Sequence, residues 1–212
     1  MQNQERENLV KQLKNRQYIK TKTVEQAFLN TPRELFVQNE IKIQAYIDTP
    51  LHIGCSQTIS APHMVAIMVE ALDLHRDQTV LEIGGGSGYH AAVVSHIIGE
   101  KGHVYTVERH TQLAHFAEKN LKNANINNVT VHIGDGSKGL EDFAPYDRIY
   151  VTCAAPDIPP PLIEQLKDPG KLLVPIGEMT CSLILLKKNT KTIKTNDLGG
   201  CVFVPLIGKY GH

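Results

Sequence analysis

Residues 80–88 read VLEIGGGSG, an apolar run that passes into a turn rich in glycine. The apolar part predicts a buried strand over 79–83, and the pattern that follows predicts a helix over 89–98. Glycines at such a junction allow a tight turn and leave room for a ligand beside the backbone. The dinucleotide fingerprint needs Gly or Ala at the position of Tyr89, so this turn departs from it. We therefore predict a nucleotide-type pocket, although glycine-rich turns without a ligand also occur in α/β folds.

Strand and helix patterns continue to alternate after this turn. They predict strands over 103–107, 129–133, 148–152 and 171–175, helices over 111–124 and 162–166, and three later strand-like pieces over 182–187, 190–195 and 200–206. This order predicts an α/β fold with a doubly wound mixed sheet. Its last strands are expected to run antiparallel and to form a β-rich C-terminal tail.

The first third of the chain is expected to be a helical extension. Apolar residues at helical spacing predict helices over 5–15, 22–30 and 64–74. The segment 31–60 has an irregular pattern, and we expect it to form a long functional or covering loop.

Composition limits the class of protein. The 212 residues carry 22 basic and 22 acidic side chains, and 42% of them are hydrophobic, which suits one folded domain in which 1–60 belongs with 61–212. No run of five like charges forms a broad basic face, so we expect no nucleic-acid partner. No apolar run reaches about 18 residues and no signal-peptide pattern opens the sequence, so we expect a cytoplasmic protein without a membrane span. The four cysteines form no CxxC pair, and we expect neither a zinc ribbon nor a disulfide framework.

Acidic residues follow the next two predicted strands. Glu108 comes 24 positions after Gly84 and directly after strand 103–107, where a carboxylate can accept hydrogen bonds from ribose hydroxyls. Asp135 lies between two glycines after strand 129–133, where its carboxylate could accept from an adenine amino group. Taken singly, Glu108 could be a surface residue and Asp135 a turn cap. Glycines or carboxylates at three successive strand ends favour a ligand at one edge of the sheet.

The spacing of the glycines favours one class of ligand. Gly84, Gly86 and Gly88, with Glu82 just before them, resemble the first motif of class I S-adenosylmethionine-dependent methyltransferases. Methylation of base amino groups typically uses an Asn/Asp-Pro-Pro-aromatic loop, and methylation of cytosine C5 uses a Pro-Cys nucleophile. Residues 151–156 read VTCAAP and contain neither. Cys153 is therefore predicted to be a small buried residue, and bases are disfavoured as acceptors.

Residues 54–64 read GCSQTISAPHM and residues 203–206 read FVPL. Together with 32–37, 45–51, 81–89, 134–136 and 175–177, they resemble the protein-L-isoaspartate O-methyltransferase family over nearly the whole chain. The resemblance implies a Rossmann-like sheet of the class I methyltransferase type. It also implies methyl transfer from S-adenosyl-L-methionine to the carboxylate of L-isoaspartyl or D-aspartyl residues in damaged proteins, with S-adenosyl-L-homocysteine as the product. The chain departs from the common pattern at Gly85, Val202 and Gln38.

The resemblance also implies roles for single residues. Ser60 would orient the acceptor carboxylate, and its alternative role is the N-cap of the helix that follows. His63 would lie near the cofactor, or be an ordinary core or solvated histidine. The segment 202–206 would be a substrate wall, or a plain edge strand protected by Pro205. The remaining implied contacts are to the cofactor, from Gly84, Gly86, Gly88, Glu108, Asp135 and Gly136, and to the substrate, from Thr58, Ile59, Val204 and Leu206.

This transfer needs no strong base. An α-carboxyl group with a pKa of about 3.3–3.7, or an aspartyl carboxyl near 3.9, is already ionised at neutral pH. Positioning and desolvation are the tasks left to the protein. Two alternatives are methyl transfer to another carboxylate or small metabolite, and a non-catalytic protein that binds S-adenosylmethionine. We expect a monomer that acts on isoaspartyl peptides and proteins and uses no metal.

Overall fold

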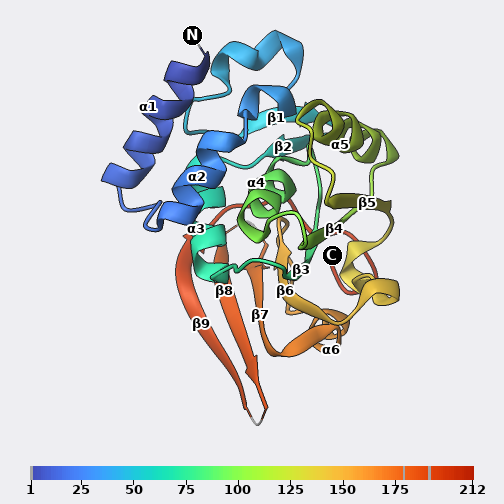
Figure 1. The fold of residues 1–212 in the computed structure, drawn as a ribbon. Coiled ribbons are helices and arrows are strands. Elements are labelled where there is room, and N and C mark those ends of the chain that lie inside the picture. The colour runs from blue at the N-terminus through green and yellow to red at the C-terminus, as the bar shows by residue number, and fades with distance from the viewer. Residues whose placement is uncertain (1, 179, 191) are drawn as a thin grey trace.

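Seven strands form one mixed sheet within residues 2–178, 180–190 and 192–212, which the computed structural model describes (Figure 1). The strand order is β5-β4-β3-β6-β7-β8-β9. The strands from β5 to β7 in this order pair in parallel, and β8 and β9 continue the sheet antiparallel. The strands are β3 (Thr79–Ile83), β4 (His103–Glu108), β5 (Val129–Ile133), β6 (Tyr146–Val151), β7 (Leu166–Gly177), β8 (Cys181–Asn189) and β9 (Thr192–Cys201).

The direction in which strands are added to the sheet reverses at β3. The chain runs from β3 through β4 to β5 at one edge, and then returns to place β6 on the other side of β3. Val80 of β3 is accordingly aligned with Val104 of β4 and with Arg148 of β6. Open α/β sheets bind ligands outside the carboxyl ends of their strands at such a reversal. The glycine turn that follows β3 lies at this point.

Alternate strand residues build two cores, one on each face of the sheet. Val80 packs into one core and Leu81 into the other, as expected for a strand that is buried on both sides. The first core contains side chains from helices α1 to α5, and the second contains Leu162 of α6 and Leu206. The helices are α1 (Gln2–Asn15), α2 (Lys22–Asn30), α3 (Pro62–Leu72), α4 (Tyr89–Ile98), α5 (Thr111–Asn123) and α6 (Pro160–Glu164).

The predicted fold class is confirmed, with a mixed sheet, N-terminal helices and antiparallel C-terminal strands. Leu9 of α1 and Val24 of α2 pack into the same core as α4, while the division of the chain at residue 60 stays a prediction. In the described part of the chain, no helix has the length and apolar character that crossing a membrane requires.

The segment 31–60 contains more regular structure than the predicted covering loop. A hairpin joins β1 (Leu51–Gly54) to β2 (Gln57–Ile59), and two non-glycine residues form its turn, Cys55 with φ of 50° and Ser56 with φ of 57°. Such φ values are uncommon outside glycine and asparagine, so the sequence lacks the usual signal of a tight hairpin. The same segment holds the 3-10 helices η1 (Arg33–Phe36) and η2 (Asn39–Gln44).

The predicted strand over 200–206 is wrong. The chain stays in β9 until Cys201. It then leaves the edge of the sheet and crosses toward the carboxyl end of β6. There Ala154 N donates to Val204 O at 2.8 Å, and Leu206 N donates to Ala154 O at 2.7 Å. These two bonds hold Pro205 beside Ala154 in an isolated parallel bridge. The C-terminal segment therefore lies over the strand ends, whereas the sequence pattern predicted a strand of the sheet.

Candidate active site

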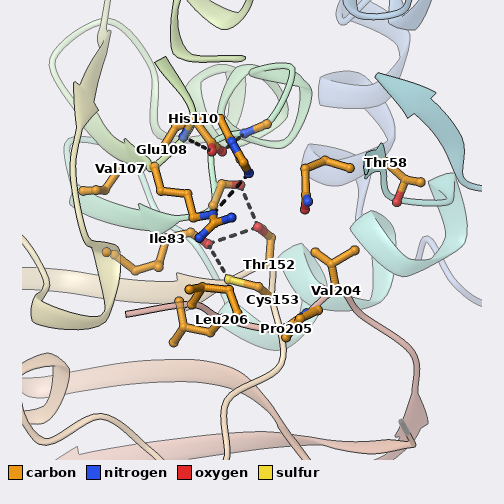
Figure 2. Close-up of a pocket in the computed structure, with 16 residues that line it drawn as sticks. Thr58, Ile83, Val107, Glu108, His110, Thr152, Cys153, Val204, Pro205 and Leu206 are labelled. Carbon is orange, nitrogen blue, oxygen red and sulfur yellow. Dashed lines mark hydrogen bonds between the residues drawn. The ribbon is translucent and has the colours of Figure 1, made fainter. Parts of the chain in front are cut away.

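A cavity of about 300 Å³ lies at the carboxyl ends of β3, β4 and β6. Figure 2 shows Glu108 and His110 on one side of it and Val204, Pro205 and Leu206 on the other. A smaller cavity of about 40 Å³ adjoins it. The residues that line both cavities are Thr58, Gly84, Gly86 and Thr152.

The structure brings most of the predicted site residues to these two cavities. Gly88, Asp135 and His63 line neither of them. Ile59 and Ser60 line the smaller cavity. The predicted site residues that line the larger cavity are Thr58, Gly84, Gly86, Glu108, Gly136, Val204 and Leu206.

The glycine turn is held tightly against the end of β6. Gly84 has φ of +93°, and a Cβ there would lie 2.3 Å from the Oγ1 of Thr152. That hydroxyl donates to the Gly84 carbonyl oxygen at 2.6 Å, and Gly84 N donates to Val107 O at 2.8 Å. Both the backbone conformation and the close approach require glycine at this position. The turn thus presents bare backbone to the cavity.

Glu108 joins the glycine turn to the end of β4. Its Oε2 accepts from Gly86 N and its Oε1 from His110 N, both at 2.9 Å. The side chain is buried, so the surface role left open by the sequence is excluded. Each carboxylate oxygen has a second lone pair available after these bonds. The carboxylate is therefore fixed in place and can still accept two further hydrogen bonds from a ligand.

A second acidic side chain is buried beside the smaller cavity. Glu82 is fully buried, and its Oε2 accepts from Thr106 Oγ1 at 2.6 Å. Burial raises the pKa of Glu82 to about 8, against the effect of the Thr106 hydrogen bond. Glu82 therefore carries a proton at neutral pH and adds no negative charge to the site.

Ser60 lies in the loop between β2 and α3. Helix α3 begins at Pro62, with Ala61 at the N-cap position and no side-chain cap, so the alternative prediction of a Ser60 N-cap is wrong. The φ that Pro62 imposes starts the helix without a cap side chain. The Ser60 carbonyl accepts from Arg33 Nη2 at 2.9 Å. Ser60 lines the smaller cavity, and its hydroxyl makes no hydrogen bond within the described residues.

Asp135 uses its carboxylate within the protein. Its Oδ1 accepts from Ser137 N at 3.0 Å and from Ser137 Oγ at 2.6 Å, and its Oδ2 accepts from Lys209 N at 2.9 Å. Burial raises the pKa of Asp135, but these bonds together outweigh it and lower the pKa. The side chain thus caps a 3-10 turn and holds the C-terminal segment, which agrees with the turn-cap alternative, and Gly136 beside it faces the cavity.

Gly88 and His63 also make contacts away from the cavities. Gly88 starts α4 with φ of +84°, and a Cβ there would lie 3.2 Å from Leu121 Cγ, so the residue allows α4 to pack closely on α5. Asp48 Oδ1 lies 2.9 Å from both the backbone N and the ring Nδ1 of His63. Asp48 thereby ties the first turn of α3 to the segment before β1.

Further lining residues were not predicted from the sequence. Thr152 follows β6 directly, so the strand-end argument used for Glu108 would also have found it. Cys153 is buried, as predicted, and burial raises the pKa of its thiol. The unpredicted residues around the larger cavity are Gln57, Ile83, Val107, Arg109, His110, Thr152, Cys153 and Ile207, while Pro205 belongs to the predicted substrate wall 202–206.

The profile of one protein family, described as Protein-L-isoaspartate(D-aspartate) O-methyltransferase (PCMT), matches residues 3–211. The chain belongs to this family. A relative from Methanococcus aeolicus, named protein-L-isoaspartate O-methyltransferase, is 53% identical over 205 residues, which cover 97% of this chain and 95% of the relative. A relative of the same name from Methanocella arvoryzae is 55% identical over 180 residues, which cover 85% of this chain and 96% of the relative.

Solved structures of family members share this architecture. One protein-L-isoaspartate O-methyltransferase superposes with a TM-score of 0.89 at 34% identity, covering 97% of this chain and 67% of that chain. A Plasmodium falciparum protein assigned to the same activity superposes with a TM-score of 0.83 at 27% identity, covering 94% of this chain and 97% of that one. The latter was solved in complex with S-adenosyl-L-homocysteine. The predicted family and its Rossmann-like class I methyltransferase fold are confirmed.

Proposed function

We propose that this protein transfers a methyl group from S-adenosyl-L-methionine to the free carboxylate of L-isoaspartyl and D-aspartyl residues in damaged proteins. Collapse of the ester to a succinimide then starts repair. Family membership over residues 3–211 supports this function. The structural observation behind it is that the cavity at the glycine turn adjoins the one lined by Ser60. A methyl donor at the turn would then meet an acceptor held at Ser60.

The residues of the larger cavity fit this cofactor. Gly84 and Gly86 line this cavity with backbone, and a Cβ at Gly84 would lie 2.3 Å from the Oγ1 of Thr152, which also lines the cavity. The two oxygens of Glu108 suit the two neighbouring hydroxyls of a ribose. Gly136 gives room for a base against the end of β3, where its own Cβ would meet Ile83. When bound, S-adenosyl-L-methionine supplies a methyl group on a positively charged sulfur.

Three predicted cofactor residues would act through the backbone that they hold. Asp135 fixes the loop of Gly136, and Gly88 sets the start of α4 directly after the glycine turn. His63 is held by Asp48 at the start of α3, close in sequence to Ser60. We propose that these residues shape the cavity without contacting the ligand.

Ser60 would orient the acceptor. Its hydroxyl is free to donate to a carboxylate oxygen, and no residue has to remove a proton because that carboxylate is already ionised at neutral pH. The protonated Glu82 beside the smaller cavity does not repel the anion. Thr58 and Ile59 would contact the acceptor peptide from the same loop, and Val204 and Leu206 would do so from the C-terminal segment.

A matched pair of peptides tests this function. The protein is incubated with methyl-labelled S-adenosyl-L-methionine and with peptides that differ only in an isoaspartyl or an aspartyl residue, and base-labile methanol is measured. We expect label on the isoaspartyl peptide alone. Equal labelling of both peptides would indicate a different carboxylate or metabolite as substrate. Tight cofactor binding without any ester would indicate a protein that binds the cofactor and does not turn it over.

We also infer that the enzyme works as a monomer in the cytoplasm. The described residues of one copy already bring the glycine turn, Ser60 and the C-terminal segment together around the two cavities. The four cysteines are free, which suits a reducing compartment. Light scattering on the purified protein tests the monomer, and a dimer at assay concentration would contradict it. Fractionation of cells followed by detection of the protein tests the location.

A further inference from the structure

Arg33 is a fully buried arginine for which the proposed reaction has no role so far. It lies in η1 and has no exposed surface. Its Nη2 donates to the Ser60 carbonyl oxygen at 2.9 Å. Its guanidinium carbon lies 4.8 Å from the centroid of the Tyr89 ring. Arg33 therefore connects the loop that carries Ser60 to the first residue of α4, which directly follows the glycine turn.

The positive charge of Arg33 is poorly compensated. Its Nε and Nη1 have no hydrogen-bond partner among the described residues. No ion pair between those residues includes Arg33. Burial lowers the pKa of Arg33, while its interactions with Tyr89 and Asp48 oppose the shift. A guanidinium stays charged in proteins. Because an unpaired buried charge is costly, such a cation favours an anion placed nearby.

The smaller cavity is the space in which such an anion can lie. Ser60 and Tyr89 both line it and both contact Arg33, which is not itself a lining residue. Ser60 and Tyr89 thus separate the Arg33 guanidinium from the cavity. Its field acts there through a protein interior, where charges are screened less than in water.

We propose that Arg33 is the positioning residue of the acceptor site, which it organises by holding the Ser60 peptide group and by attracting the acceptor carboxylate with its buried charge. This inference rests on the proposed function. The carboxylate loses its negative charge as the methyl group arrives, so the charge of Arg33 stabilises the bound acceptor more than the transition state. The charge therefore acts on KM, whereas the hydrogen bond to the Ser60 carbonyl acts on kcat through the geometry of the loop.

Two substitutions separate these contributions. Arg33→Lys keeps the charge and loses the planar donor, so we expect a lower kcat with KM for the isoaspartyl peptide changed less than threefold. Arg33→Met removes both, so we expect KM to rise about 10- to 100-fold as well, because the bound carboxylate loses its attraction to a buried charge. The Kd for S-adenosyl-L-homocysteine should stay unchanged in both variants.

Arg148→Met is the matched control. Arg148 is also buried, and it donates to the carbonyl oxygens of Leu72 at 2.7 Å and Asp73 at 3.1 Å, away from the cavities. Its loss should lower the melting temperature and leave KM for the peptide unchanged. A lower melting temperature with an unchanged KM for the peptide is the result expected of a buried arginine that has only a structural role.

The decisive measurement compares two peptides as ligands of the loaded enzyme. One carries the isoaspartyl α-carboxylate, and the other carries a neutral amide at the same position. The wild-type protein should prefer the carboxylate, and Arg33→Met should lose most of that preference while Arg33→Lys keeps it. An unchanged preference in Arg33→Met would overturn the inference, and so would an equal loss of affinity for both peptides. If the wild-type protein does not methylate the isoaspartyl peptide, the proposed function fails instead.

Discussion

Replacement of Gly85 by alanine should force Thr106 out of its place. A Cβ at Gly85 would lie 2.6 Å from Thr106 Oγ1 and 3.5 Å from its Cγ2. Thr106 is fully buried and donates its hydroxyl to Glu82, so it cannot move into open space. The backbone at Gly85 is not left-handed, and the cost is therefore one of crowding alone.

The contacts set the size of the effect. Overpacking of a buried site costs about 1–3 kcal/mol, and loss of the hydrogen bond between Thr106 and Glu82 adds about 1–2 kcal/mol. The smaller conformational freedom of alanine in the unfolded chain offsets about 0.4–1 kcal/mol of this. We expect a net loss of about 2–3 kcal/mol, which lowers the melting temperature by about 4–12 °C. Gly134→Ala is the control, because the nearest atom to its Cβ would be 3.9 Å away, and it should change stability by less than about 0.5 kcal/mol.

A double-mutant cycle tests the mechanism. Thr106→Ala opens the space that a side chain at Gly85 needs, so the two changes together should cost at least about 1 kcal/mol less than their sum. Gly85→Ser combined with Thr106→Ala should recover more, because the new hydroxyl would lie close to the position of the lost one beside Glu82. Urea unfolding of the wild-type protein, of Gly85→Ala, of Thr106→Ala and of the variant with both changes gives the coupling energy. Additive effects would show that crowding against Thr106 does not explain the glycine.

Four further substitutions test the site. Ser60→Ala should lower kcat about 10- to 100-fold with the Kd for S-adenosyl-L-homocysteine unchanged, measured by initial rates and calorimetry; loss of cofactor binding would contradict its role at the acceptor. Glu108→Gln should raise the Kd for S-adenosyl-L-homocysteine at least about tenfold. Asp135→Ala should mainly lower the free energy of unfolding, by about 1–2 kcal/mol. Equal effects of the two substitutions on this Kd would contradict the placement of Glu108 in the cavity wall and of Asp135 outside it. Glu82 keeps its proton in the native state up to a pKa of about 8, but ionises near pH 4.5 when unfolded. Unfolding therefore releases a proton between these values, and the free energy of unfolding should fall as pH rises from about 4.5 to about 8, a slope that Glu82→Gln should remove.

The sequence predicted the part of the fold in which local pattern and burial agree. The strands 79–83 and 129–133 and the helix 89–98 match the structure in every residue. The hairpin 51–59 could not be predicted, because two non-glycine residues form its turn. The segment 200–206 has the composition of a strand, but its partner is Ala154, which lies far away in sequence.

The same limit applies to the site. Glu108 could be found because the end of a parallel strand has a fixed place in an α/β sheet. That argument is equally valid for Asp135, but its carboxylate accepts three hydrogen bonds within the chain and lines neither cavity. Arg33 belongs to a segment that resembled the family, yet its place behind Ser60 depends on tertiary packing. Sequence patterns thus located the edge of the sheet at which the two cavities lie, and only the structure separates the residues that line them from the residues that support them.

The bridge between Ala154 and residues 204–206 has a consequence for how the enzyme is made. Residue 206 is synthesised after every strand of the sheet, yet Val204 and Leu206 form a wall of the larger cavity. A chain cut short after Cys201 would keep every strand of the sheet and lose this wall. Leu206 also belongs to the second core, so such a chain would lose packing as well. A message that stops after the last strand, or a protease that cuts there, is therefore expected to yield a protein without a finished cavity.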